Sequence, residues 1–263
     1  MKRQKIRLPF KPIIIILIIL LAFFFILGYI WTILSNSTYF TVKEVVVRGQ
    51  DVNIDLSYLK GRNIFSLDLD KQARVILNSY PSYNYIRFYR ILPGRIYVDF
   101  IKRKPVAYLK LYKNFTIDKT GVLFNAEGEA FDVDLPLITG LETKIFGPKA
   151  GKRYNLREIK VALMILGEAG GDQILREYKL KKIDVSNLRD ISLIFQVRPK
   201  LTNNVMGFIN PPYIFEAKLT AENIKNKMKI LSGLMKLTEK DMGNIKYIDL
   251  RFNEPVIKLN NVK

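Results

Sequence analysis

Residues 13–34 read IIIILIILLAFFFILGYIWTIL, twenty-two consecutive residues without a charge. A helix of this length rises about 33 Å, which is enough to cross a hydrocarbon core of about 30 Å. The chain before this stretch is basic and has no acidic residue; its charges are Lys2, Arg3, Lys5, Arg7 and Lys11. Because a basic flank stays in the cytoplasm, the sequence predicts a cytoplasmic tail over 1–12, a membrane helix over 13–34 and an extracytoplasmic remainder.

A cleaved signal peptide is the alternative reading of the apolar stretch. Signal peptides have apolar cores of about 7–15 residues and a small-residue cleavage site. This stretch is longer, and near its end Tyr29 and Trp31 stand where an interfacial aromatic belt would lie. We therefore expect a permanent anchor, and a single-pass type II protein of the cell (inner) membrane.

The part beyond the span is strongly basic. Five of the 43 basic residues precede the span, which leaves 38 against 24 acidic residues. In a soluble protein this excess would suggest nucleic acid, but the space outside a cell membrane holds anionic lipid headgroups and wall polymers instead. An anionic partner of that kind and a surface that is merely well solvated are both open interpretations.

The chain contains no cysteine and no histidine. Disulfides are therefore excluded, as are Ser-His and Cys-His nucleophiles and zinc sites of the usual nitrogen and sulfur ligands. The catalytic chemistry that the composition still permits is a serine with a lysine, or a pair of carboxylates.

The segment after the span predicts a small α+β module. The expected elements are a strand over 40–49, a short helix capped by Asn53, a helix from Ser66 up to Pro81, and strands over 83–92 and 95–102. The strands rest on alternation of apolar and polar residues, and a Pro93-Gly94 turn closes the hairpin. Since neither helix can bury its apolar stripe except against that sheet, the elements form one module.

After Pro105 the sequence is dominated by short alternating segments. The expected elements are strands over 106–112, 115–118 and 122–124, a buried connection over 135–140, a helix from Asn155 with Glu158 as capping-box partner, strands over 180–185, 191–197, 205–209 and 213–219, a helix from Thr220, and strands over 245–252 and 256–259. We interpret 106–260 as one antiparallel sheet with helices on a face.

Several short motifs occur one after another along the chain. They are Phe40, Val42, Val45, Val47 and Gly49; Pro93 with Arg103, Pro105, Val106 and Ala107; Asp118, Gly121 and Phe124; Leu135, Pro136 and Gly140; and Ile248, Asp249, Leu250 and Arg251. In this order, behind a basic tail and one span, the chain resembles the FtsQ/DivIB family of bacterial cell-division proteins. Lys102 departs from the family, which usually has an acidic residue there.

The resemblance implies a fold and a function. It implies an α+β protein with a single N-terminal transmembrane helix, a small POTRA-type α+β domain over 38–105, and a larger antiparallel β-sheet domain with flanking helices over 106–260. It implies a non-enzymatic divisome scaffold, located at midcell, that links early cytoplasmic division proteins to the extracytoplasmic regulators of septal peptidoglycan synthesis. Its expected partners are FtsB- and FtsL-type coiled-coil proteins, with no cofactor, metal, nucleic acid or small-molecule substrate.

The working surface of such a scaffold is expected on the last strands. A terminal strand exposes an edge whose unpaired N–H and C=O groups can accept a partner's strand, and Pro255 marks its start. The residues expected to pair are Val256, Ile257, Lys258 and Leu259. The resemblance adds Arg251 and Phe252 as partner-binding residues. Alternation places Phe252 on the face of Ile248, so a core position for its ring is an equally open reading.

An enzyme is the competing hypothesis. Ser57 and Lys60 fit the S-x-x-K of penicillin-binding serine acyltransferases, and Ser82-Tyr83-Asn84 and Lys119-Thr120-Gly121 fit the two motifs that follow. The first two motifs are only twenty-five residues apart, which is too few for a subdomain that buries a nucleophile and its oxyanion donors.

Two further alternatives are weaker. The pairs Asp68 with Asp70 and Asp132 with Asp134 could hold a hard cation, although such pairs more often cap helices or lie in turns. A POTRA-containing secretion component would need a long β-barrel, for which this chain has no room.

Overall fold

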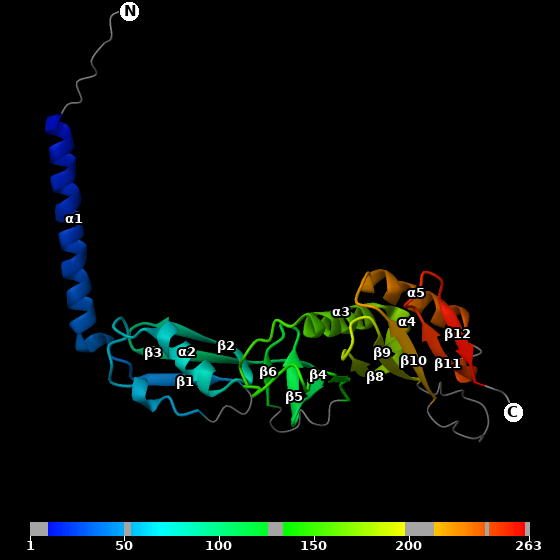
Figure 1. The fold of residues 1–263 in the computed structure, drawn as a ribbon. Helices are drawn as coiled ribbons and strands as arrows, with labels where there is room; N and C mark the ends of the chain where they lie inside the picture. Colours follow the sequence, from blue (N-terminus) through cyan, green and yellow to red (C-terminus); the bar gives the residue numbers. More distant parts are fainter. Residues whose placement is uncertain (1–9, 50–53, 126–133, 198–212, 240–241, 261–263) are drawn as a thin grey trace, which may run out of the picture. The chain divides into compact units, whose positions relative to one another are not determined.

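The computed structural model describes residues 10–49, 54–125, 134–197, 213–239 and 242–260. They divide into two compact units (Figure 1): residues up to 79 together with 83–101, and residues 80–82 together with those from 102 onward. Four expected features lie outside the described residues: most of the basic tail, the capping residue Asn53, the carboxylate Asp132 and the strand over 205–209.

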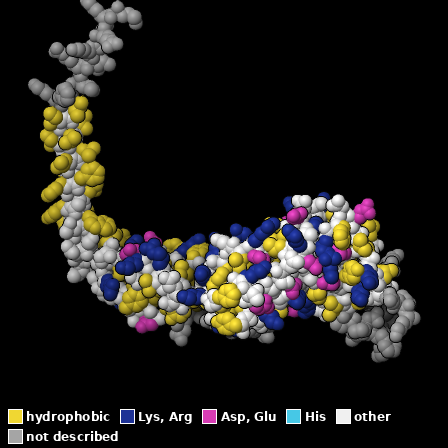
Figure 2. Space-filling model, viewed as in Figure 1, with side chains coloured by type: hydrophobic (Ala, Val, Ile, Leu, Met, Phe, Trp, Pro, Cys, Tyr) yellow, Lys and Arg dark blue, Asp and Glu magenta, His cyan; other side chains and the backbone are white. Residues whose placement is uncertain are grey.

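The apolar stretch forms one long helix, α1 (Phe10–Asn36), which begins three residues before the expected span and ends two after it. Within the described residues, it is the helix that is long and apolar enough to cross a membrane, by length and composition. Its large apolar side chains are exposed all around it (Figure 2), as they must be in a helix that faces lipid rather than a protein core.

The first unit contains a three-stranded sheet covered by a helix. Its elements are the 3-10 turns η1 (Thr38–Phe40) and η2 (Ser57–Leu59), the helix α2 (Leu69–Ser79), and the strands β1 (Glu44–Arg48), β2 (Tyr83–Ile91) and β3 (Arg95–Lys102), in the sheet order β1-β3-β2. β1 pairs with β3 in parallel. Ile96, Val98 and Phe100 of β3 are buried as their alternation predicts, and they form the core with Leu59 and Ile76.

Two element boundaries in this unit differ from the expected ones. The first strand starts at Glu44 rather than at Phe40, because the backbone of Phe40 and Val42 is bonded to the segment 61–64 instead of to the sheet. The helix starts at Leu69 rather than at Ser66, since the carboxylate of Asp68 accepts the N–H of Lys71 at 2.9 Å and so caps it.

The second unit is built on a nine-stranded sheet in the order β12-β11-β10-β9-β8-β7-β4-β5-β6. The strands are β4 (Pro105–Lys110), β5 (Asn114–Asp118), β6 (Leu123–Phe124), β7 (Leu137–Thr139), β8 (Tyr178–Asp184), β9 (Ile191–Val197), β10 (Ile214–Leu219), β11 (Ile245–Asp249) and β12 (Val256–Leu259). The helices are α3 (Arg157–Gly171), α4 (Gln173–Glu177), α5 (Ile224–Leu237) and the 3-10 turn η4 (Met242–Asn244). The fold class is therefore the expected one: α+β, with one apolar helix and a large sheet with flanking helices.

The sheet is mixed rather than wholly antiparallel. β7 pairs in parallel with β4 and β8, and β10 pairs in parallel with β11. The expected buried connection over 135–140 is thus a central strand, β7. Helical segments explain two of these parallel pairs, because α3 and α4 carry the chain from β7 to β8, and α5 carries it from β10 to β11. The chain runs from β4 to its parallel neighbour β7 through β5 and β6.

The helices of this unit correct one expectation and confirm another. The capping box from Asn155 to Glu158 is wrong: α3 begins at Arg157, Leu156 caps it without a side-chain bond, and Glu158 instead receives a 2.8 Å bond from Lys144. In α5, the four apolar residues expected on one face are all buried in the core; they are Ile224, Met228, Leu231 and Met235.

Candidate partner-binding edge

β12 lies at one end of the nine-strand order. It pairs antiparallel with β11, with Val256 opposite Asp249 and Ile257 opposite Ile248. On its other side no strand follows among the residues that the structure describes. Backbone N–H and C=O groups along that side can therefore bond an added strand.

The side chains of β12 suit a surface that becomes covered. Val256 is 49% and Leu259 is 55% exposed, while Ile257 is half-buried and packs against the core. The exposed Lys258 lies over the ring of Tyr247 at 5.8 Å. Because Val256 and Leu259 are three residues apart, they lie on opposite faces of the strand, and a covering segment could contact an apolar side chain on either face.

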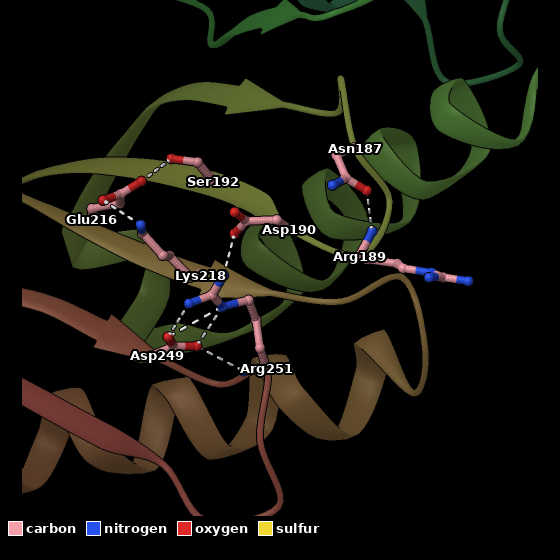
Figure 3. Close-up of polar contacts among 8 residues, drawn as sticks. All are labelled: Asn187, Arg189, Asp190, Ser192, Glu216, Lys218, Asp249 and Arg251. Carbon is pink, nitrogen blue, oxygen red and sulfur yellow. Dashed lines mark hydrogen bonds and ion pairs between the residues drawn. The ribbon is translucent and has the colours of Figure 1, made fainter.

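The end of β11 carries an arginine bound by two carboxylates (Figure 3). Arg251 contacts the buried Asp249 through Nε, at 3.0 and 3.1 Å, and through Nη2, at 2.6 Å. The backbone N–H of Arg251 also bonds the Asp249 carboxylate, at 3.0 Å. Nη1 of Arg251 lies 3.1 Å from Oδ1 of Asp190, which belongs to the turn before β9. Arg251 thus links the turn before β9 to the turn after β11.

Electrostatics holds this cluster in its charged form. Hydrogen bonds from Arg251 outweigh the opposing effect of burial and lower the pKa of Asp249 below its ordinary value. The bonds to Asp249, with a contribution from Asp190, raise the pKa of Arg251. Asp249 is buried, whereas the Asp190 side chain is 43% exposed, so the contact with Asp190 is the one that solvent or a partner can replace.

Phe252 lies outside the core. Its side chain is 64% exposed, because β11 ends at Asp249 and the strand expected to reach Phe252 stops three residues short. Leu250 is still buried, and its N–H bonds the carbonyl of Lys218 at 2.7 Å. The Arg251 guanidinium lies 5.7 Å from the Phe252 ring centroid. Of the two readings of Phe252, the structure favours the exposed one.

Sequence reasoning missed the carboxylates that hold Arg251. Asp249 could have been found, because residues two apart on a strand share a face. Asp190 gave no such signal, since it is far away in the sequence. A second polar cluster lies close by on neighbouring strands, where Lys218 pairs with Glu216 at 3.7 Å and Ser192 donates to Glu216.

The residues of the enzyme hypothesis occupy ordinary turns. Ser57 opens η2, and its backbone N–H bonds the carboxylate of Asp55 at 2.8 Å. Lys60 donates its backbone N–H to the carbonyl of Ser57. Ser82 lies directly before β2, and Lys119 lies in the turn between β5 and β6, in the second unit.

The carboxylate pairs likewise have structural roles. Asp68 caps α2, and Asp134 accepts a 3.0 Å bond from Lys181. Among the described residues, no three His, Cys, Asp or Glu side chains gather where a metal ion could be held.

The fold and its edge define a class of protein: in the part of the chain that the structure describes, it is a membrane-anchored α+β protein with one apolar helix and a sheet whose last strand pairs on one side only. No protein-family model matches the chain. Three curated proteins, each named cell division protein FtsQ, are similar to it.

The similarity is low in identity and differs in extent among the three proteins. The protein from Myxococcus fulvus is 28% identical over 115 residues, 43% of this chain and 40% of its own length. The protein from Syntrophotalea carbinolica is 25% identical over 167 residues, 61% and 58% of the two lengths. The protein from Geotalea daltonii is 23% identical over 239 residues, 88% and 80%. The first two matches thus span less than two thirds of those relatives. The chain is thus similar to proteins of the FtsQ family, and this similarity supports a role in cell division.

Proposed function

We propose that the chain is a non-enzymatic divisome scaffold that acts by protein–protein contacts at its carboxy-terminal sheet edge. The single observation that carries the proposal is β12, which pairs on one side only among the described strands and follows the exposed Phe252 in the chain. A protein without chemistry acts through contacts, and an open strand edge supplies main-chain bonds for affinity and alternate side chains for specificity.

Partner binding proceeds in this proposal by strand addition. An extended segment of an FtsB- or FtsL-type coiled-coil protein pairs with residues 256–259, and its apolar side chains cover Val256 and Leu259. An acidic residue of that segment takes the place of Asp190 at Nη1 of Arg251. Asp249 keeps the guanidinium in position during the exchange, because its bonds to Nε and Nη2 are independent of Nη1.

The membrane orientation is a second part of the proposal. The basic tail stays in the cytoplasm, and both folded units lie outside, where septal peptidoglycan is made. A reporter that works only outside the cytoplasm should be active when fused after Lys263. Activity of a cytoplasmic reporter at that site, and none of the external one, would refute this orientation and with it the proposed contact with external regulators.

The test of the scaffold function is co-isolation of the coiled-coil partners with the full-length chain in detergent. Phe252→Ala and Arg251→Glu should each lower the recovered partner, the first by removing an apolar contact and the second by repelling the acidic residue. Phe146→Ala is the matched control, since Phe146 is an exposed phenylalanine away from the edge. Equal recovery with all three variants, with folding verified by circular dichroism, would place the interface elsewhere.

A further inference from the structure

The end of α1 is bonded to the folded part of the first unit. Nδ2 of Asn63 donates to the backbone carbonyls of Leu34 and Ser37, at 2.9 Å each. The carbonyl of Leu34 is among the last four of the helix, which have no partner within it. The ring of Trp31 meets that of Phe65 edge to face, with centroids 6.1 Å apart. Since tryptophan favours the interface between lipid and water, the loop with Asn63 and Phe65 lies at that interface.

The turn between β2 and β3 is connected to the same end of α1. The carbonyl of Gly94, in that turn, accepts the N–H of Lys43 at 2.8 Å and that of Glu44 at 3.3 Å. The approach is so close that a Cβ on Gly94 would collide with the carbonyl oxygen of Thr41. Thr41 in turn forms a β-bridge with Asn63. Three contacts therefore connect the hairpin turn to the end of the membrane helix: Gly94 with Thr41, Thr41 with Asn63, and Asn63 with Leu34.

Large apolar side chains are exposed at this end of the unit. Leu92 is 55% and Ile91 is 41% exposed at the hairpin turn, and Tyr39 is 64% exposed just after the helix. Such side chains, gathered on one part of a surface, indicate an apolar partner. The bilayer is the neighbour that the covalent structure guarantees here, because α1 ends at Asn36.

The charges of the same segments are mainly basic. Residues 38–44, 60–65 and 91–95 contain Lys43, Lys60, Arg62 and Arg95 and a single acid, Glu44. Glu44 is bound to Arg95 at 3.0 Å, and the Lys43 side chain runs beside Gly94. Apolar side chains flanked by long basic ones suit the headgroup layer, where the stem lies in apolar surroundings and the cation reaches phosphate.

We propose that the hairpin turn and the loop around Arg62 form a second membrane contact, in which Ile91 and Leu92 enter the headgroup layer and Lys43 and Arg62 bind lipid phosphate. The leaflet is the one from which α1 emerges. The contact holds the small domain on the bilayer surface instead of leaving it on a free tether. This inference rests on the membrane helix and not on the proposed scaffold function, so the two can fail separately.

Environment-sensitive fluorescence tests the contact directly. Since the chain has no cysteine, Leu92→Cys in the full-length protein can carry a single polarity-sensitive dye after reconstitution into vesicles of phosphatidylcholine and phosphatidylglycerol. We expect the dye's emission to shift to the blue, and to be quenched by lipids with a nitroxide on the headgroup. Ser79→Cys is the control, because Ser79 ends α2 and lies four residues before β2, a strand that reaches about 27 Å to the hairpin turn.

Three outcomes would overturn the proposal. The first is an emission maximum at Leu92 as water-like as that at Ser79. The second is a blue shift that disappears when the protein-to-lipid ratio is lowered, because a second copy of the chain would then be the occupant. The third is a shift that is the same in the variant Lys43→Gln/Arg62→Gln as in the unchanged chain, since the two cations, and the phosphate they are proposed to bind, would then have no part in the contact.

Discussion

Nη1 of Arg103 lies 2.6 Å from Oδ2 of Asp118, and both side chains are nearly buried. Arg103 also donates through Nε to the carbonyl of Pro81, at 3.0 Å. The pair therefore joins the residues that follow β3 to the end of β5 and to the turn before β2. Loss of one partner from a buried ion pair leaves the other charge without compensation, which costs about 3–5 kcal/mol.

Arg103→Ala should accordingly lower the free energy of unfolding by about 3 kcal/mol. Urea unfolding of the detergent-solubilised chain, followed by circular dichroism, measures the change. Lys104→Ala is the control, because Lys104 is the exposed neighbour of Arg103 and its loss should leave the midpoint unchanged. A midpoint for Arg103→Ala equal to that of the control would show that the pair is not stabilising.

Acid should weaken the same contact. Burial raises the pKa of Asp118, but hydrogen bonds from Thr120, from the N–H of Val122 and from Arg103 outweigh it, and the pKa falls below its ordinary 3.8. A carboxylate with a lowered pKa stabilises the fold above its unfolded-state pKa, and this contribution is lost as the pH falls through 3.8 and below. Between pH 7 and pH 3 the stability of the unchanged chain should therefore fall more than that of Asp118→Asn, and an equal fall would contradict the assignment.

Removal of Asp190 should strengthen partner binding. Asp190 occupies Nη1 of Arg251, the position that the proposed acidic residue of the partner needs. An exposed pair is worth about 0.2–1 kcal/mol, so Asp190→Ala should lower the dissociation constant by up to about fivefold. Asp190→Glu keeps the charge and is the matched control. Weaker binding by Asp190→Ala would mean that the partner does not use this side of Arg251.

Proline substitutions at two adjacent positions of β12 distinguish backbone groups that bond a partner from those that bond β11. Neighbouring residues of an antiparallel strand alternate between bonded and non-bonded positions toward β11. Of Ile257→Pro and Lys258→Pro, one variant should therefore keep its unfolding midpoint and lose about fivefold in partner affinity, the equivalent of one hydrogen bond. The other should lower the midpoint. Undiminished binding by both would remove the partner from this edge.

Gly140 should not tolerate a side chain. Its φ is +88°, and a Cβ there would collide with the backbone nitrogen of Ser186. Gly140→Ala should destabilise the chain by at least about 2 kcal/mol, because backbone strain and a steric clash add. Gly167→Ala, in α3, is the control: nothing lies near the added methyl, and alanine favours a helix by about 0.5–1 kcal/mol. The two unfolding midpoints should move in opposite directions.

The parts of the fold that the sequence predicted well have long and regular patterns. β9 and β12 begin and end where alternation placed them. β7 was misread because three residues are too short to show a period. The start of α3 was misplaced because Asn155 is a good capping residue by type, but a side chain can cap only where the backbone turns.

The bounds of β12 could be predicted from the sequence, and the ion pairs of the neighbouring Arg251 could not. The position of β12 follows from order along the chain, and Phe252 was ambiguous because alternation does not say where a strand stops. The bond from Arg251 to Asp190 joins two turns that only the complete sheet brings together. Long-range ion pairs of this kind leave no trace in a local pattern.

Because two bonds link Asn63 to the end of α1, a rotation of the membrane helix about its axis also rotates the first unit. One residue added to an α-helix turns everything after it by about 100° and moves it by about 1.5 Å. Because the first unit is bonded to this helix end, that turn would be passed on to the unit. The length of the membrane segment therefore determines which side of the small domain faces other proteins in the same bilayer.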